Sequence, residues 1–504
     1  MPLFKKMILP AAVFITGGCV LILEVTATRV LAPYFGNTIY TVSGIIGVIL
    51  AALSLGYYFG GRLADRRPDS AWFYGIILTG GLAVMALQVM TNLILPFLGN
   101  ALSLIYGPLI AAVILFFLPA LLLGMLSPYA IKLQSLNFPE TGIGSISGLI
   151  FFWSTLGSIV GSLLTGFVLI PNFGVDKIIM GVGALLIVSG FLPLLKNGRR
   201  MKYLFLIFLV SFILSVEYLV IGLGANNLVY RHDGVYEKLL IYDGEYKGRS
   251  TRFFQQDRSN SGARYLDTDE LVFDYTKYYA LYKIFNPQLK KALIIGGGAY
   301  SIPKALLKEP GVELVEVAEI EPSLYDLAKK YFRLADDQRL TNHVIDGRRW
   351  LHDSQNRYDL IFSDVYYSLY SVPVHFTTEE FFKLAKSKLN DKGVFMANLV
   401  GNLDNRPPSL IFSEIKTFKA VFPNSYFFAV NSPDIKATQN IIFLGFNSDQ
   451  TINFSESKIK NNPDKIISQA GEKLIGFGQI DFSLYNRLSD NYAPVEYLTA
   501  KVLD

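Results

Sequence analysis

The chain is poor in cysteine, histidine and charged residues. Cys19 is the only cysteine among 504 residues, so an intramolecular disulfide and a thiolate metal site are excluded. The four histidines are scattered without the spacing of zinc ligands, which argues against a metal centre. Charged residues make up 17%, and no lysine- or arginine-rich run is interleaved with aromatic residues. Nucleic acid is therefore not expected as a partner.

Apolar residues make up 51% of the chain, and their long runs gather in the N-terminal half. Each run is long enough to cross a hydrocarbon core of roughly 30 Å as a helix. We count seven runs, near 8–31, 41–60, 72–98, 103–127, 145–170, 175–195 and 203–223. No small-residue cleavage pattern follows the first run, so we expect a retained span and not a removed signal peptide. Residues 1–223 are thus predicted to form a multi-pass α-helical domain of an integral plasma membrane protein.

The distribution of basic residues predicts an orientation in the membrane. Positive residues mark cytoplasmic loops. They gather in alternate loops, at Arg62, Arg66, Arg67 and Arg199, whereas the opposite loops hold little beyond Lys177. Seven spans would then place the C-terminal half outside the cytoplasm. Because that result conflicts with a cytosolic cofactor, the side of the membrane that holds the C-terminal half stays open.

The fifth apolar run contains a glycine spacing that is typical of packed membrane helices. Gly157 and Gly161 are separated by three residues. Such glycines let two helix backbones approach closely in lipid. We therefore expect a packing role for them.

The C-terminal half has more charge and shorter apolar runs, as in a soluble domain. Residues 224–289 are predicted to form a small β-rich lead-in and a linking helix. From 290 to 504, strand-like runs alternate with helix-like segments, which predicts a largely parallel sheet. The strand-like runs are ALII, VELVEVAEI, TNHVI, YDLIFSD and KGVFMANLV. Residues 425–446 are expected to add an antiparallel hairpin. The predicted fold is a Rossmann-like α/β domain that follows the membrane domain.

A glycine turn follows the first of these strands. Gly296, Gly297 and Gly298 permit a tight turn and a close approach of the backbone to a ligand. The start of the following helix favours negative charge. A turn of glycines before a helix is equally compatible with a purely structural role.

Acidic residues end the next three strands, at Glu319, Asp346 and Asp364. Ligands of open α/β sheets bind beyond the carboxyl ends of the strands. A carboxylate at Glu319 can accept hydrogen bonds from both ribose hydroxyls, with Glu321 as the nearby alternative, and one at Asp346 can accept from an adenine amino group. Each acid alone is compatible with a cap at the end of its strand. The three together, after a glycine turn, favour a nucleoside site.

The residues after the glycines bear on the kind of nucleoside. A dinucleotide-binding fold places a third glycine where this sequence has Ser301. Ser301 can instead cap the helix, with Pro303 in its first turn. A pyrophosphate site also does not require Asp346 and Asp364. The pattern therefore favours an S-adenosyl cofactor.

Two capping boxes are predicted near the site. Thr377-x-x-Glu380 precedes the helix-like segment FFKLAKSKL, and Asp267-x-x-Glu270 precedes the linking helix. In a capping box the two side chains satisfy free backbone N–H groups at a helix start. We therefore expect a helix to begin at each of them.

Acidic and aromatic residues on the linking helix and in one loop are candidates for substrate binding. Asp274, Tyr275 and Tyr279 on the linking helix can form the wall of a cleft for a cation, and the tyrosines can equally belong to the core. Tyr367 lies in the tyrosine-rich loop that follows Asp364. Such a loop can cover a site during catalysis.

The stretches LIIGGGAYS, VAEIEPSLYDLAKKYF, DGRRWL, YDLIFSD and HFTTEEFF resemble the spermidine synthase-type aminopropyltransferases. The whole chain resembles bacterial membrane proteins in which such a domain is fused to a multi-span N-terminal region. TATRVLAPYFGNTIYTVSGIIGVILAALSLGYYFGGRLADR and LSDNYAPVEYL carry that likeness. The resemblance implies a Rossmann-like fold of the class I S-adenosylmethionine-dependent transferase type. It also implies decarboxylated S-adenosylmethionine as co-substrate, no metal, and a small amine acceptor.

The same resemblance implies roles for individual residues. It makes Asp364 the catalytic base, Glu319 the ribose ligand, and Asp346 with Gly347 the adenine contact. For Asp364 the chemistry agrees, because an alkylammonium with a pKa near ~10 cannot attack until it loses a proton.

The sequence departs from the resembled family where amines are held. The family usually carries an aspartate directly after the three glycines, where this chain has Ala299. It carries a second aspartate three residues after the base, where this chain has Tyr367. The family also carries a glutamine in the β-rich lead-in, and this sequence has Ser261 near the corresponding place. Three acids elsewhere are candidates for replacing the lost ones: Asp274, Asp490 and Glu496.

Three functions stay open from the sequence. The first is a membrane-anchored aminopropyltransferase. The second is a methyltransferase that uses intact S-adenosylmethionine on a small molecule, and the third is a non-catalytic adenosyl-ligand sensor or transporter. The by-product, methylthioadenosine or S-adenosylhomocysteine, separates the first two. The acceptor and the oligomeric state, a homodimer included, stay open as well.

Overall fold

The structure is a computed structural model that describes residues 2–194, 210, 227–366, 372–448, 451–478 and 480–503. The chain separates into two compact units, Met1–Asn226 and Asn227–Asp504. The seventh apolar run, 203–223, lies outside the described residues except for Val210, and so does Tyr367. The predicted seventh span therefore stays a prediction.

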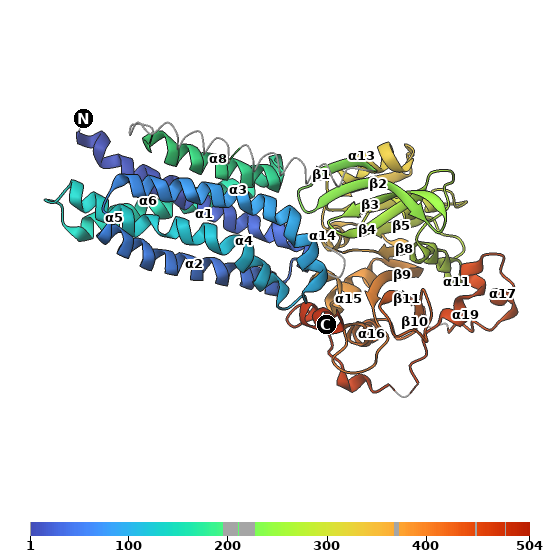
Figure 1. The fold of residues 1–504 in the computed structure, drawn as a ribbon. Helices are drawn as coiled ribbons and strands as arrows, with labels where there is room; N and C mark the ends of the chain where they lie inside the picture. Colours follow the sequence, from blue (N-terminus) through green and yellow to red (C-terminus); the bar gives the residue numbers. More distant parts are fainter. Residues whose placement is uncertain are drawn as a thin grey trace. The chain divides into compact units, whose positions relative to one another are not determined.

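The described part of the N-terminal unit consists of long apolar helices that run alongside one another (Figure 1). They are α1 Pro2–Phe35, α2 Ile39–Arg66, α3 Ser70–Ala101, α4 Gly107–Gly124, α5 Leu126–Asn137, α6 Ile143–Leu164, a π-helix at Thr165–Leu169, α7 Ile170–Asn172 and α8 Val175–Leu194. Within this part, six stretches are long and apolar enough to cross a membrane, and they coincide with the first six predicted runs. The fourth continues to Asn137 because α5 follows α4 almost without a break.

The glycine spacing in α6 brings that helix against the backbone of α1, as expected. A Cβ atom at Gly157 would lie 2.0 Å from the carbonyl oxygen of Phe14. A Cβ atom at Gly161 would lie 2.4 Å from the carbonyl oxygen of Gly18. Only glycine permits this approach, which increases the packing contact between the two helices.

The C-terminal unit begins with an antiparallel sheet in the order β1-β2-β3-β4. The strands are β1 Leu228–Asp233, β2 Lys238–Tyr246, β3 Arg249–Gln256 and β4 Ser259–Tyr265. Lys247 and Gly248 join β2 to β3, and both have positive φ. That backbone matches the twist of paired strands and fixes their register. The β-rich lead-in predicted for this region is therefore present.

The helix after this sheet begins later than its predicted capping box. It consists of α10 Asp274–Lys277, a 3₁₀ turn at Tyr278–Leu281 and α11 Tyr282–Phe285. The predicted cap is wrong, because the carboxylates of Asp267 and Glu270 instead bind the guanidinium of Arg249, at 3.0 and 2.8 Å. An arginine from β3 thus competes successfully with the local backbone for both acids.

A seven-stranded sheet forms the body of this unit, in the order β10-β11-β9-β8-β5-β6-β7. The strands are β5 Lys291–Ile295, β6 Leu314–Glu319, β7 Leu340–Val344, β8 Tyr358–Ser363, β9 Leu389–Gly401, β10 Ser425–Ala429 and β11 Gln439–Phe446. The first five pair in parallel. The hairpin of β10 and β11 pairs antiparallel with β9, as predicted. This is the predicted Rossmann-like fold.

Helices cover both faces of this sheet, which explains the continuous apolar runs of its strands. They include α12 Ser301–Leu306, α13 Leu324–Phe332, α14 Gly347–Asp353, α15 Glu379–Ser387 and α16 Leu410–Val421. Ile294 packs into one core and its neighbours Leu293 and Ile295 into the other. Successive residues of a strand point to opposite faces, so β5 contributes to both cores.

Short elements complete the chain. They are a 3₁₀ turn at Val374–Phe376, α17 Ser457–Lys460, α18 Lys465–Ser468, α19 Ala470–Lys473, a 3₁₀ turn at Phe482–Leu484 and α20 Val495–Leu503.

Two further capping predictions differ from the structure. The N-cap of α15 is Thr378 and not Thr377. The hydroxyl oxygen of Thr378 accepts a hydrogen bond from the N–H of Phe381, whereas the hydroxyl of Thr377 donates to the carbonyl oxygen of Val374. Ser301 does not cap α12, because the N-cap is Tyr300 in a left-handed conformation without a side-chain bond. Each misplaced cap moves a helix start by one residue.

Candidate active site

A cavity of about 380 Å³ lies at the carboxyl ends of the parallel strands. Its lining combines the glycine turn after β5 with the acids that end β6 and β8 and with Asp346 after β7. The lead-in sheet and α10 supply further lining residues. The parallel register brings these strand ends to one edge, so the residues that the sequence predicts for a nucleoside site share one cavity.

The glycine turn approaches the loop after β8 too closely for any side chain. Gly296 has a φ of +90°, and a Cβ atom there would lie 2.2 Å from the carbonyl oxygen of Asp364. Ala299, next after the glycines, is 6% exposed, and its methyl carbon faces β4 so closely that a Cβ at Gly262 would lie 2.3 Å away. Ala299 therefore packs its methyl group against the backbone of Gly262 in β4.

Glu319 is buried at the end of β6 and binds the backbone of the glycine turn. Its carboxylate accepts the N–H of Gly297 at 2.7 Å and the N–H of Glu321 at 2.8 Å. Burial raises the pKa of Glu319, and these backbone donors oppose the rise. Glu321 lines the same cavity but accepts hydrogen bonds from the N–H of Tyr236 and from Ser323. Glu319 therefore lies directly against the turn, and Glu321 lies toward the lead-in sheet.

Asp346 caps α14 and faces a histidine from the loop after β8. One oxygen accepts the N–H of Arg349 at 2.9 Å, and the other lies 3.0 Å from Nε2 of His375. Gly347 follows, and a Cβ atom there would lie 2.1 Å from Cγ2 of Ile295. Both residues line the cavity, so α14 is held close to β5 at this point.

Asp364 lies at the centre of the sheet and has two side-chain donors. Nδ2 of Asn398 donates to Oδ1 at 2.9 Å, and the hydroxyl of Tyr275 forms a second hydrogen bond. Burial raises the pKa of Asp364, and both hydrogen bonds oppose the rise. Such a carboxylate, oriented by two donors in a cavity, suits a role in proton transfer.

The other predicted substrate residues are dispersed. Tyr275 and Asp274 line the cavity, but the two oxygens of Asp274 are bound by Lys247 at 2.7 Å and Lys277 at 2.8 Å. Tyr279 is 9% exposed and its hydroxyl bonds Glu309, away from this lining. Tyr275 is thus the tyrosine of α10 that meets Asp364.

Glu237 is a cavity residue that the sequence reasoning missed. It is 9% exposed, and its Oε2 has no hydrogen-bond partner in the described part of the chain. Burial, together with the nearby carboxylates of Asp257, Glu319 and Glu321, holds the pKa of Glu237 well above its ordinary value. The available signal in the sequence was an acid of the predicted β-rich lead-in, directly before β2.

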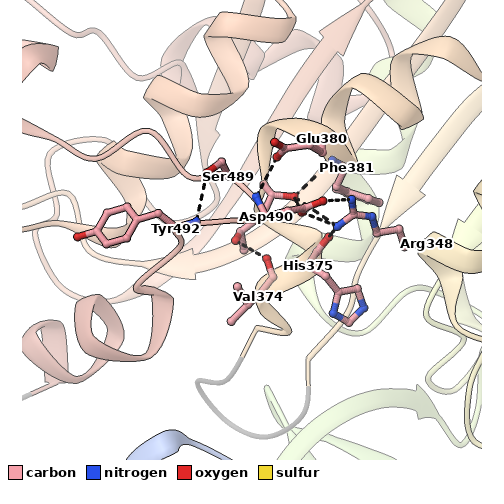
Figure 2. Close-up of polar contacts among 10 residues, drawn as sticks. Arg348, Val374, His375, Glu380, Phe381, Ser489, Asp490 and Tyr492 are labelled. Carbon is pink, nitrogen blue, oxygen red and sulfur yellow. Dashed lines mark hydrogen bonds and ion pairs between the residues drawn. The ribbon is translucent and has the colours of Figure 1, made fainter.

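Figure 2 shows the polar contacts of Asp490, a residue of the terminal motif that is not among the described residues lining the cavity. Its carboxylate accepts from both terminal nitrogens of Arg348, at 2.8 and 2.6 Å, and from the hydroxyl of Thr378 at 2.7 Å. Its N–H donates to Glu380 at 3.0 Å. Asp490 therefore does not replace a lost amine-binding acid, and neither it nor Glu496 lines the cavity in the described part of the chain.

The cavity is strongly acidic. Among the described residues, its lining includes no lysine, arginine or histidine. It does include six carboxylates: Glu237, Asp274, Glu319, Glu321, Asp346 and Asp364. Within the same described residues, no group of three histidine, cysteine or acidic side chains is placed to hold a metal ion. Two lysines bind Asp274 and the pKa of Glu237 is raised, but the other carboxylates still favour the binding of cations.

The C-terminal unit is therefore a Rossmann-like α/β domain with a glycine turn and acidic residues around a cavity at its strand ends. Residues 275–456 match the spermine/spermidine synthase domain family. The sequence resemblance to this family is confirmed.

Relatives with curated names cover different parts of the chain. Polyamine aminopropyltransferase 2 of Aquifex aeolicus is 22% identical over 474 residues, which is 90% of this chain and 90% of that protein. Polyamine aminopropyltransferase 1 of Streptomyces coelicolor is 24% identical over 384 residues, 71% of this chain and 69% of that protein. A probable spermidine synthase structure from Corynebacterium glutamicum covers 49% of this chain and 89% of its own, with 20% identity and a TM-score of 0.42.

Proposed function

We propose that the protein is a membrane-anchored aminopropyltransferase, which moves an aminopropyl group from decarboxylated S-adenosylmethionine to an amine. The observation that carries this proposal is the acidic cavity, whose described lining holds six carboxylates and no basic side chain. Both reactants are cations, and a cavity of opposite charge favours their binding. A phosphate-bearing nucleotide would meet repulsion in the same place.

The charge of the cavity also favours the decarboxylated cofactor over the intact one. Intact S-adenosylmethionine carries a carboxylate beside its ammonium, whereas the decarboxylated form carries only positive charges. Near the glycine turn the described lining offers Ala299 and no lysine or arginine to pair with a carboxylate. The relatives from Aquifex and Streptomyces are named polyamine aminopropyltransferases, which supports the transfer of an aminopropyl group.

In the proposal, the residues at the carboxyl ends of the strands hold the cofactor. Glu319 accepts from the ribose hydroxyls, and Asp346 with Gly347 meets the adenine. Gly296, Gly297 and Gly298 let the cofactor lie against the backbone, where a side chain would collide. These contacts hold the sulfonium carbon near Asp364, and fixed proximity of the reactants lowers the barrier.

Asp364 acts as the base. It takes one proton from the acceptor ammonium, and the freed nitrogen attacks the aminopropyl carbon bound to sulfur. A C–N bond forms, the C–S bond breaks, and its electron pair neutralises the sulfonium to give methylthioadenosine. The Tyr275 hydroxyl and the Asn398 amide orient the carboxylate. Such positioned proton transfer contributes about 10²–10⁴-fold to a rate.

The membrane placement belongs to the proposal as well. Six described helices are long and apolar enough to span a bilayer, and we infer a multi-pass protein of the plasma membrane. Use of a cytosolic cofactor requires the C-terminal unit on the cytoplasmic side. A reporter fused after Asp504 tests this, and a periplasmic signal would contradict it.

The activity is tested with the purified full-length protein in detergent. It is offered decarboxylated or intact S-adenosylmethionine with a panel of amines, and the nucleoside product is identified by mass spectrometry. Methylthioadenosine that depends on an added amine supports the proposal. S-adenosylhomocysteine would assign a methyltransferase instead, and tight nucleoside binding without turnover would assign a sensor.

A further inference from the structure

Asp364 divides the cavity into two chemically different halves. The strand order places β5, β6 and β7 on one side of β8, and β9, β11 and β10 on the other. The first side carries the glycine turn, Glu319 and Asp346. The second side, here called the acceptor half, is lined by amides and apolar side chains. Its residues are Asn398, Val400, Val430, Asn431 and Asn440.

Three side chains of neighbouring strands form a hydrogen-bonded row in the acceptor half. Nδ2 of Asn440 donates to Oδ1 of Asn398 at 3.0 Å, and Nδ2 of Asn398 donates to Asp364 at 2.9 Å. The carboxylate of Asp364 can only accept, so Asn398 must present its NH₂ group there. Its oxygen then faces Asn440, which fixes the orientation of both amides. The side-chain oxygen of Asn440 is left as an acceptor at the far end of the row.

The described lining of the acceptor half contains no carboxylate beyond Asp364. Asp274 lines the cavity near Tyr275, but two lysines bind its oxygens. Glu414 lies near Tyr366 behind the lining, is 1% exposed, and does not reach the cavity. A charged group that leaves water without an ion pair is penalised heavily. A second ammonium in this half would find neutral polar groups and no second carboxylate among the described lining residues.

We propose that the acceptor is a primary amine whose far end is a neutral polar group, a hydroxyl or an amide. The attacking amine meets Asp364, and the far end donates to the side-chain oxygen of Asn440. This inference rests on the proposed aminopropyl transfer and narrows its substrate class. A diamine whose far ammonium enters the acceptor half is excluded as the preferred acceptor, because this half offers only the carboxylate of Asp364.

The test compares two acceptors of equal length, 4-aminobutan-1-ol and 1,4-diaminobutane. Full-length protein in detergent receives decarboxylated S-adenosylmethionine and either amine, and methylthioadenosine release gives kcat/KM. We expect the amino alcohol to exceed the diamine by about tenfold or more, the size of one charge-assisted contact. Equal or better turnover of the diamine overturns the inference and leaves the transferase function standing.

A substitution reverses the expected preference. Asn440→Asp adds a carboxylate at the far end of the row, so the ratio of the two kcat/KM values shifts toward the diamine by about tenfold. The matched control is Asn405→Asp, which adds the same charge to an exposed residue outside the cavity lining. An unchanged ratio in Asn440→Asp, or an equal shift in both variants, contradicts the proposal.

Measurements of amine binding distinguish a failure of the inferred acceptor class from a failure of the proposed transferase function. If neither amine yields methylthioadenosine, the transferase function fails. Calorimetric titration of both amines into the methylthioadenosine-loaded protein then decides the inference. Tighter binding of the amino alcohol supports it, whereas tighter binding of the diamine, or binding of neither, overturns it.

Discussion

The carboxylate of Asp490 accepts two hydrogen bonds from the guanidinium of Arg348, across 142 residues of sequence. Arg348 is the second residue of α14, which begins at Gly347 in the cavity lining. The same arginine donates to the carbonyl of His375 at 3.1 Å, and the ring of His375 meets Asp346. The terminal motif thus fixes the adenine side of the proposed site without entering it.

Removal of this contact should loosen that side of the cavity. We expect Asp490→Ala to cost about 1–2 kcal/mol of stability, because a two-point charged contact is lost at a partly exposed site. The dissociation constant for methylthioadenosine should rise severalfold. Thermal unfolding and calorimetry of the full-length protein measure the two effects.

The control for this prediction is Arg349→Ala. It breaks the pair of Arg349 with Asp353 within α14, whose arginine side chain is 69% exposed. Such an exposed pair on one helix is screened by water and contributes little to stability. Equal losses in the two variants would show that Asp490 has no special role.

The pH dependence of turnover should report the environment of Asp364. Burial raises the pKa of Asp364, and the donors Asn398 and Tyr275 oppose the rise. The base is the carboxylate, so kcat/KM falls as pH drops through that raised pKa. Asn398→Leu removes one donor, and the acid limb should move to higher pH by about one unit. Asn398→Gln restores a donor, so the acidic limb of its pH profile should move part of the way back. If the acidic limb of Asn398→Leu stays where it is in the natural protein, Asp364 is not the base.

Glu414 predicts a pH-dependent stability. Burial raises the pKa of Glu414 from 4.5 to about 8, and neither carboxylate oxygen has a hydrogen-bond partner among the described residues. Between these values the folded state binds a proton that the unfolded state has lost. The free energy of unfolding therefore falls as pH rises, by roughly 1.4 kcal/mol per unit. Glu414→Gln should flatten this slope and be the more stable protein near pH 8.

The comparison for Glu414 is Glu313→Gln. The Glu313 side chain is 57% exposed and pairs with Lys290 at the surface. The substitution of Glu313 should leave the pH dependence of the free energy of unfolding as it is in the natural protein. Thermal unfolding at a series of pH values measures all three proteins, and parallel slopes would contradict the burial of a carboxyl at 414.

Two glycines of α6 predict opposite outcomes of one substitution. Gly157→Ala forces a methyl group into the carbonyl of Phe14, and backbone cannot yield cheaply. We expect a loss of about 1–3 kcal/mol, typical of overpacking. In Gly148→Ala no atom of the described residues lies within 4 Å of the new methyl group, so this variant should be neutral or slightly stabilising. Equal unfolding temperatures of the two variants in detergent would contradict the packing of α1 on α6.

Local sequence patterns predicted the strands and the acidic residues at their ends, because these depend on neighbouring residues in the chain. Strand runs such as YDLIFSD are apolar because both faces of the sheet are covered, and their ends place Glu319 and Asp364 together by register alone. Asp490 was different, because its partner Arg348 lies on a distant helix and no spacing relates the two. Long-range contacts of this kind depend on packing that no local motif encodes.

The caps show how tertiary contacts override a correct local motif. Asp267 and Glu270 have the spacing of a capping box, but Arg249 from β3 binds both carboxylates. Glu237 was not predicted for a related reason, since a single acid before β2 does not reveal that Glu319 and Glu321 will be its neighbours. The side chains of the acceptor half were also unpredicted, because β9 and β11 become neighbours only in the folded sheet.

The central claim is tested most directly by following the transferred carbons. Decarboxylated S-adenosylmethionine labelled with carbon-13 in the aminopropyl group is incubated with the full-length protein and an amine. The account predicts that the label appears on the amine and the methyl group stays in methylthioadenosine, with a rate that Asp364→Asn lowers about hundredfold or more. A methylated amine, a label that stays on the nucleoside, or an Asp364→Asn variant of full activity would contradict it.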